Sequence, residues 1–145
     1  MGDEYWLRKA IDLAYHCSPS ATAFSVGAVI VDGGTIVAEG YSRQETTADH
    51  AEEAALRRLG GATATMTLYS SLEPCGQRAS RPASCASLIL AAGIPRVVYA
   101  WAEPDTFVVP AGARMLIDAG VEVRVLPELA SLAAQPNAHL RNISG

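Results

Sequence analysis

Four residues of the chain have side chains whose types and spacing are suited to joint chemistry. His50 and Glu52 stand two residues apart in "HAE", and Cys75 and Cys85 follow later in the sequence. One imidazole and two thiolates form a set that zinc binds tetrahedrally, and three protein ligands leave the fourth position open for water. Glu52 would lie in the first helical turn after His50, where its carboxylate reaches that water without binding the metal. The pattern predicts three zinc ligands and, in Glu52, a group that moves protons.

The same four residues also have an ordinary structural interpretation. His50 would then cap a helix, Glu52 would face solvent, and the two cysteines would lie in the core. That interpretation needs four coincidences at ordered positions, so the catalytic zinc site is favoured, although "HAE" alone would not favour it. A zinc-stabilised binding module without turnover is a further alternative, in which replacing Glu52 by Gln would change nothing.

Composition narrows the class of protein. A chain of 145 residues, half of them hydrophobic, predicts one domain over residues 1–145 with a substantial core. The net charge of −4 argues against a protein held to nucleic acid by bulk electrostatics. No apolar run approaches the ~18 residues of a membrane span. The first residues are charged and amphipathic, unlike a signal peptide, and three unevenly spaced cysteines do not suggest a disulfide framework, so we expect a cytoplasmic location.

Hydrophobic periodicity and turn residues predict the elements that position the four residues. Helices are expected over 3–17, 49–59, 82–93, 110–120 and 127–135, the second of them capped by Asp49 and ended by Gly60-Gly61. Strands are expected in a hairpin over 25–41 that turns at Asp32-Gly33-Gly34, and over 65–72, 96–102 and 121–126. Residues 136–145 are expected to be a loose tail.

This order of elements predicts the architecture. Helical crossovers join the last three strands and make them parallel neighbours, which gives a three-layer α/β/α sandwich on a mixed five-stranded sheet. Ligands bind such sheets at the carboxyl ends of strands, near helix N-termini. His50 would open the second helix, Cys75 would follow the third strand, and Cys85 would lie near the start of the third helix. We therefore expect all three to meet at one edge of the sheet.

The motifs "HAE" (50–52) and "LEPC" (72–75), with the later Cys85, resemble the zinc-dependent cytidine deaminase superfamily. The resemblance implies a cytidine deaminase-like fold, a bound Zn²⁺, a small heterocyclic substrate and a homodimer or homotetramer. It also implies hydrolytic removal of an exocyclic amine, in which Glu52 takes a proton from water and delivers protons to the ring nitrogen and the departing ammonia.

Nine residues separate Cys75 from Cys85, whereas most of the superfamily uses C-x-x-C. In this the chain is similar to the pyrimidine deaminase domain of riboflavin biosynthesis, whose spacer usually has eight residues. The segments "SVGAVIV", "IVAEGY", "AGIPRVVYA" and "LIDAGVEVRVL" also resemble that domain. The chain looks like a free-standing relative without the reductase domain. The implied substrate is the diaminopyrimidine ribosylamino phosphate of that pathway.

The resemblance is weaker around the expected substrate. Thr22-Ala23-Phe24 stands where that domain usually has Pro-Asn-Pro, Gly76-Gln77 replaces Ser-His, and Glu103-Pro104-Asp105 replaces Asp-Pro-Asn. A cytosine nucleoside or nucleotide, or an aminated ring of specialised metabolism, therefore stays open as the substrate. The branch of tRNA adenosine deaminases shares "LEPC" but has the short cysteine spacing and needs a basic face, which this acidic chain lacks.

Six residues are candidates for contact with the substrate: Ala51, Phe24, Arg78, Arg81, Glu103 and Asp105. The two arginines lie in the spacer and would clamp a phosphate or simply be loop charges; Arg81 matches an arginine of the family pattern when counted back from Cys85. The two carboxylates would accept hydrogen bonds from the ring or cap a helix. Phe24 would stack on a heterocycle or belong to the core.

Overall fold

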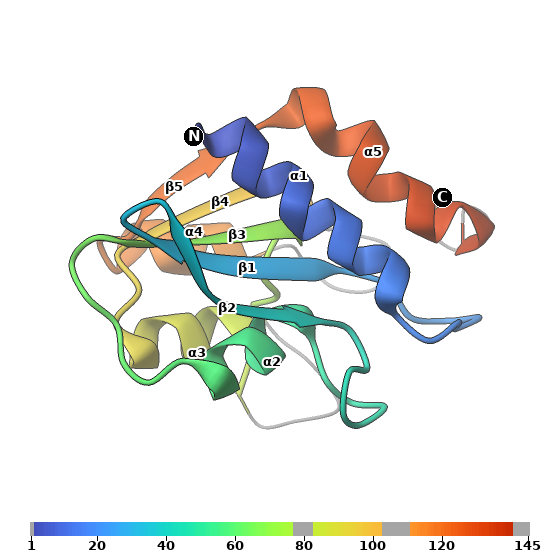
Figure 1. The fold of residues 1–145 in the computed structure, drawn as a ribbon, viewed down its shortest axis with the longest axis horizontal. Helices are drawn as coiled ribbons and strands as arrows, with labels where there is room; N and C mark the ends of the chain where they lie inside the picture. The colour runs from blue at the N-terminus through green and yellow to red at the C-terminus, as the bar shows by residue number, and fades with distance from the viewer. Residues whose placement is uncertain (1, 77–82, 103–110, 141–145) are drawn as a thin grey trace.

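The computed structural model describes residues 2–76, 83–102 and 111–140 of the chain (Figure 1). Its strands are β1 (Gly27–Asp32), β2 (Thr35–Tyr41), β3 (Met66–Leu72), β4 (Arg96–Trp101) and β5 (Glu122–Val125). Its α-helices are α1 (Asp3–Leu13), α2 (Ala51–Arg58), α3 (Cys85–Ala92), α4 (Gly112–Asp118) and α5 (Ala130–Ala134). Short 3₁₀ segments cover Ala14–His16, Pro127–Leu129 and Gln135–Leu140. The predicted order of elements is confirmed.

The five strands form one mixed sheet in the order β2-β1-β3-β4-β5. β1 runs antiparallel to both β2 and β3, whereas β3, β4 and β5 are parallel to one another. The β1–β2 hairpin turns at Gly33 and Gly34, whose φ angles of 58° and 81° lie in the left-handed region that glycine adopts readily. The predicted hairpin and the parallel crossovers are both present.

Helices cover both faces of the sheet. In Figure 1, α1 and α5 lie on one side of it, and α2 and α3 on the other. Successive residues of β1 point to opposite faces: Val29 belongs to the apolar cluster under α1, and Ile30 to the cluster over α2 and α3. α4 packs on α3 and β5. The three-layer α/β/α sandwich is therefore confirmed. None of the helices described here is both long and apolar enough to cross a membrane.

The start of α2 differs from the prediction. Asp49 is not the N-cap; His50 takes that position, in a capping box with Glu53. The Asp49 carboxylate instead accepts hydrogen bonds from the backbone N–H groups of Glu45 and Thr46, both at 2.9 Å, and from Arg57. The sequence pattern assigned the Asp49 carboxylate to the start of α2, but in the structure it hydrogen-bonds the loop that precedes the helix. The helix begins one residue later and still starts at the expected motif.

The expected loose tail is folded as far as the structure describes it. Residues 135–140 form 3₁₀ turns, and Asn137 and Leu140 are buried. The Asn137 side-chain amide accepts from the backbone N–H of Ser25 and donates to its carbonyl oxygen. The prediction was therefore wrong for 136–140, because an amide that pairs with a distant loop leaves no local pattern in the sequence. Residues 141–145 lie outside the described residues.

Candidate active site

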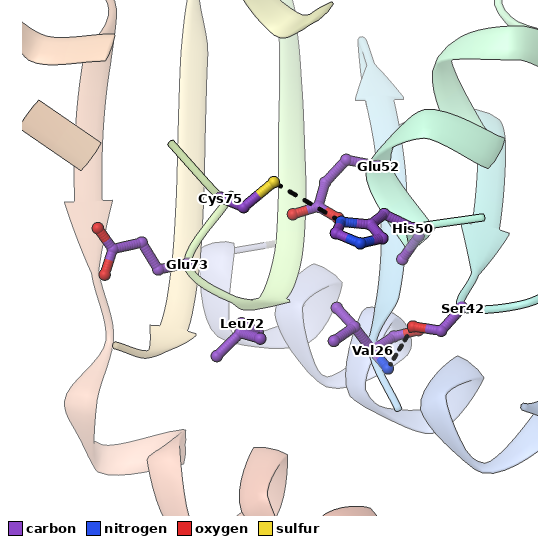
Figure 2. A pocket seen from close by; sticks show the side chains of 8 residues that line it. Val26, Ser42, His50, Glu52, Leu72, Glu73 and Cys75 are labelled. Atoms are coloured by element: carbon purple, nitrogen blue, oxygen red, sulfur yellow. Dashed lines mark hydrogen bonds between the residues drawn. The ribbon is translucent and has the colours of Figure 1, made fainter. Parts of the chain in front are cut away.

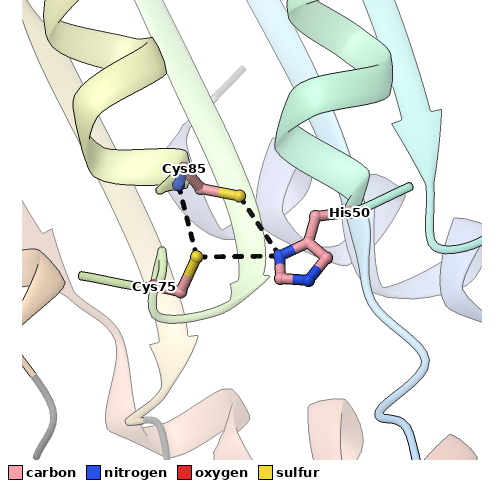
Figure 3. Close-up of side chains that lie close together, drawn as sticks. All are labelled: His50, Cys75 and Cys85. Carbon is pink, nitrogen blue, oxygen red and sulfur yellow. Dashed lines mark hydrogen bonds between the residues drawn. The ribbon is translucent and has the colours of Figure 1, made fainter. Parts of the chain in front are cut away.

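The three predicted metal ligands lie together at one edge of the sheet (Figure 3). His50 Nδ1 lies 3.6 Å from Cys75 Sγ and 3.3 Å from Cys85 Sγ, and the three atoms lie within 4.8 Å of one another. Zinc bonds of about 2.3 Å to sulfur and about 2.0 Å to nitrogen, at tetrahedral angles, place those atoms about 3.6 Å apart. The donor set and its spacing fit a zinc ion that takes the Nδ1 atom of His50.

Each ligand is held by the start of a helix or the end of a strand. His50 is the N-cap of α2, and Cys85 is the first residue of α3, after the N-cap Ser84. Cys75 follows β3, and its carbonyl oxygen accepts a hydrogen bond from Ala86 N at 3.0 Å. Two helix N-termini therefore converge on the cluster, and their partial positive charges favour thiolates over thiols.

The loop that carries Cys75 is packed closely against α4. A Cβ atom on Gly112 would overlap the carbonyl oxygen of Pro74, so glycine is required where the two segments cross. Glu73 lines the same region, but its Oε2 accepts a hydrogen bond from Ala113 N at 3.1 Å, and Figure 2 shows its carboxylate pointing away from His50. Glu73 thus anchors the loop to α4 rather than facing the cluster.

The surroundings of Cys75 lower the pKa of its thiol and so favour metal binding. Its hydrogen bond with the Cys85 side chain lowers the pKa of the Cys75 thiol to about 4; burial opposes this, while His50 and the Cys85 backbone N–H add to it. That N–H donates to Cys75 Sγ at 3.2 Å. Since the thiolate is the form that binds metals, the folded chain presents Cys75 in its ligating state at neutral pH.

A small pocket opens beside the cluster (Figure 2). Its lining comes from the end of β3, the start of α2 and the loops before β1, after β2 and after β3: Val26, Ser42, His50, Ala51, Glu52, Leu72, Glu73 and Cys75. Glu52 is 4% exposed. Burial raises the pKa of the Glu52 carboxyl, the negative charge of Cys75 raises it further, and His50 opposes the shift. The pocket thus brings a buried carboxyl beside His50 and Cys75, as the "HAE" spacing predicted.

The substrate candidates have different outcomes. Ala51 lines the pocket. Phe24 is not among the described residues that line it; its ring packs on the apolar cluster and meets Trp101 edge to face, at 5.3 Å and 82°. Phe24 in this structure therefore belongs to the core packing. The other four, Arg78, Arg81, Glu103 and Asp105, lie outside the described residues.

Sequence reasoning missed the residues that hold the pocket wall. The Arg43 guanidinium donates to the carbonyl oxygens of Ser18 and Phe24, at 2.8 and 3.1 Å, and to Ser25 Oγ at 2.8 Å. Ser42 Oγ accepts from Val26 N at 2.9 Å. These bonds join the segment before β1 to the segment after β2, which the β1–β2 hairpin brings together, but the sequence pattern did not indicate which side chains make them.

Comparisons with known proteins agree with this geometry. The chain is 42% identical over 126 residues to the diaminohydroxyphosphoribosylamino-pyrimidine deaminase of Schizosaccharomyces pombe, covering 83% of this chain and 31% of that protein. It is 40% identical over 129 residues to the riboflavin biosynthesis protein RibD of Escherichia coli, covering 85% of this chain and 33% of that protein. The chain thus spans about a third of the length of these curated relatives.

A solved structure of Acinetobacter baumannii RibD superposes with a TM-score of 0.83 at 34% identity, covering 98% of this chain and 40% of that one. The model of the cytidine and deoxycytidylate deaminase zinc-binding region matches residues 1–101, which include His50, Glu52, Cys75 and Cys85. These matches confirm the resemblance found in the sequence motifs. The chain therefore belongs to the cytidine and deoxycytidylate deaminase family.

Proposed function

We propose that the chain is a zinc-dependent hydrolytic deaminase that removes an exocyclic amine, as ammonia, from a small pyrimidine-like heterocycle. The observation that carries the proposal is the convergence of His50 Nδ1 and the two cysteine sulfurs beside the buried Glu52. The first candidate substrate is the diaminopyrimidine ribosylamino phosphate of riboflavin biosynthesis, because the S. pombe relative is named for that deamination and the E. coli relative for riboflavin biosynthesis.

His50, Cys75 and Cys85 would hold the metal. When bound there, zinc supplies a Lewis acid that makes water a nucleophile at neutral pH. The chain's own residues fix the site around it: the hydrogen bond from Cys85 N to Cys75 Sγ sets one thiolate, and the α2 capping box orients the backbone of His50. The pocket beside these ligands is where the ring to be attacked would lie.

Glu52 would move the protons of the reaction. Its carboxylate takes one proton from the attacking water while the oxygen forms a bond to the ring carbon, and it passes that proton to the ring nitrogen. It then takes the remaining hydroxyl proton and delivers it to the amine, so that the C–N bond breaks and ammonia leaves. One water is consumed, a C=O bond replaces the C–N bond, and Glu52 returns to its starting state.

The residues expected to contact the substrate lead to a narrower proposal about which ring is deaminated. We assign Arg81, with Arg78, to a substrate phosphate, and Glu103 or Asp105 to hydrogen bonds with the ring. Ala23 stands where the riboflavin-pathway domain usually has an asparagine and cannot make that side-chain hydrogen bond. A cytosine nucleoside or nucleotide is therefore the second candidate substrate, and an aminated ring of specialised metabolism the third.

A panel assay tests the function. Protein prepared without chelator should carry about one zinc per chain by elemental analysis. Ammonia release is then measured with the diaminopyrimidine ribosylamino phosphate, its dephosphorylated analogue, cytidine, deoxycytidylate and cytosine. We expect the phosphorylated diaminopyrimidine to give the highest kcat/KM. A higher kcat/KM with a cytosine compound would favour the second candidate substrate. Zinc-loaded protein that releases no ammonia from any compound of the panel would contradict the proposed substrate class.

The oligomer and the compartment belong to the same proposal. The expected homodimer or homotetramer and the cytoplasmic location stay predictions from the sequence.

A further inference from the structure

Ser70 is a buried serine in the middle of β3, next to Glu52. It has no exposed surface, and its Oγ lies 3.2 Å from Glu52 Oε2 and 2.7 Å from the carbonyl oxygen of Leu72. Leu68 and Leu72, two residues away on either side, belong to the apolar cluster on the α2 face of the sheet. The two-residue period of a strand therefore directs Ser70 toward α2, from which Glu52 projects.

A hydroxyl at this position is costly unless it is hydrogen-bonded, because its neighbours on that face are apolar. The Leu72 carbonyl alone would satisfy it. The second contact places the hydroxyl against one oxygen of a carboxyl group that is itself almost fully buried. Ser70 thus contacts Glu52 from the sheet and is not among the described residues that line the pocket.

A serine hydroxyl suits a carboxyl group that gains and loses a proton during a reaction. Its single hydrogen can be donated to Oε2 when Glu52 is ionised, and also when Glu52 carries a proton on Oε1, because the carboxyl oxygen without the proton still accepts. The Leu72 carbonyl oxygen, 2.7 Å away, is a second acceptor for the same hydrogen. The contact between Ser70 and Glu52 can therefore persist through both proton transfers of the proposed cycle.

We infer that Ser70 is a positioning residue for Glu52: it fixes Oε2 from within the sheet and leaves Oε1 for proton transfer. The inference rests on the proposed function. A buried glutamate has three side-chain torsions, and an error of about 1 Å in the place of a catalytic group can cost on the order of 10²-fold in rate. Loss of the Ser70 hydroxyl should therefore lower kcat while leaving the ligands, the pocket and substrate binding intact.

Three variants of Ser70 separate the hydroxyl from the shape of the side chain. Ser70→Ala removes the hydroxyl. Ser70→Thr and Ser70→Val have the same size as each other and differ in the hydroxyl alone, so any strain from the added bulk is common to both. Ser71→Ala is the matched control: Ser71 is equally buried on the same strand, but its Oγ accepts from Gly27 N at 3.1 Å, away from Glu52.

The kinetic result expected with zinc-loaded protein is a split between kcat and KM. Ser70→Ala and Ser70→Val should lose about 10- to 100-fold in kcat, as for a hydrogen bond to a charged group, with KM within about twofold and zinc content unchanged. Ser70→Thr should exceed Ser70→Val by about tenfold or more. Ser71→Ala should keep kcat even if it lowers thermal stability. Equal kcat for the Thr and Val variants, or full kcat in Ser70→Ala, would overturn the inference.

A structural readout keeps the test independent of turnover. Crystal structures of zinc-loaded wild type and Ser70→Ala should show one Glu52 conformer in the first and a displaced or divided one in the second. An unmoved Glu52 in Ser70→Ala contradicts the positioning role. Glu52→Gln, assayed in parallel, separates the two proposals: if it is inactive while Ser70→Ala is fully active, only the Ser70 inference fails, and if Glu52→Gln is active, the proposed function of Glu52 fails.

Discussion

At the scale of single residues, the cluster owes its chemistry to two cysteines, one in the loop after β3 and one at the start of α3. Cys85 opens α3 and donates its backbone N–H to Cys75 Sγ at 3.2 Å, which lowers the pKa of its partner in addition to the side-chain contact. Metal binding releases few protons when a ligand is already ionised, so affinity at neutral pH is higher than for ordinary cysteines. The ligands also join the start of α2 to the start of α3.

Cys85→Ala should therefore lose the metal. We expect its zinc content to fall from about one per chain to near zero after dialysis, and its thermal midpoint to become insensitive to a chelator that lowers that of the wild type. Cys17→Ala is the control, since Cys17 lies outside the cluster and its thiol points to the carbonyl oxygen of Val26. Full zinc in Cys85→Ala, or equal loss in both variants, would contradict the ligand assignment.

At the scale of elements, a second charged cluster ties α1 to the sheet. The Asp3 carboxylate lies in the first turn of α1 and accepts two hydrogen bonds from Arg96 of β4, at 2.9 and 2.6 Å. It also accepts one from Arg124 of β5 and one from Tyr69 of β3, both at 2.6 Å. The hydrogen bond with Arg96 is the largest of the contacts that hold the pKa of Asp3 well below its usual range. One carboxylate thus joins α1 to all three parallel strands.

This cluster should make stability fall in acid. A carboxyl whose pKa is lowered by folding stabilises the protein above its unfolded pKa, near 4, and loses that contribution as the pH falls toward the folded value. Asp3→Asn should cost about 2 kcal/mol in the free energy of unfolding at pH 7, and the difference from wild type should shrink between pH 5 and pH 2. Urea unfolding of both proteins at several pH values between 7 and 2 measures this difference in the free energy of unfolding.

Glu4→Gln is the matched control. Glu4 pairs with Arg8 one turn along α1, but both side chains are more than half exposed, so the change should stay within about 0.5 kcal/mol at any pH. A difference between Asp3→Asn and wild type that does not change with pH would mean that the Asp3 carboxylate contributes by packing rather than by charge.

Sequence predicted elements well where the signal is local. Gly33-Gly34 marked the hairpin, and Gly93, with φ of 80°, ends α3 where the pattern placed its end. The two errors have different causes. The Asp49 carboxylate accepts hydrogen bonds from the backbone N–H groups of Glu45 and Thr46, four and three residues earlier, so a local turn competes with the cap of α2 for the same side chain. Asn137 pairs with Ser25, 112 residues earlier, and that pairing depends on tertiary structure, which propensities do not contain.

At the scale of the whole molecule, the crossover topology explains why the site forms where it does. β3 and β4 are parallel, so the loop after β3 and the helices that flank it meet at the same edge of the sheet. The motif spacing was enough to place His50, Glu52, Cys75 and Cys85 there. It did not reveal Ser70, although the alternation Leu68, Ser70, Leu72 puts a polar residue on the α2 face and would have indicated it.

The central claim is that Glu52 moves protons beside a zinc ion, and one comparison tests it most directly. Wild type and Glu52→Gln, each checked for one zinc per chain, are assayed for ammonia release from the best substrate of the panel. We predict equal zinc and a loss of kcat of about 10²–10⁴-fold in Glu52→Gln, because the amide cannot accept and return the proton. A Glu52→Gln variant that holds zinc and turns over near the wild-type rate would contradict the account.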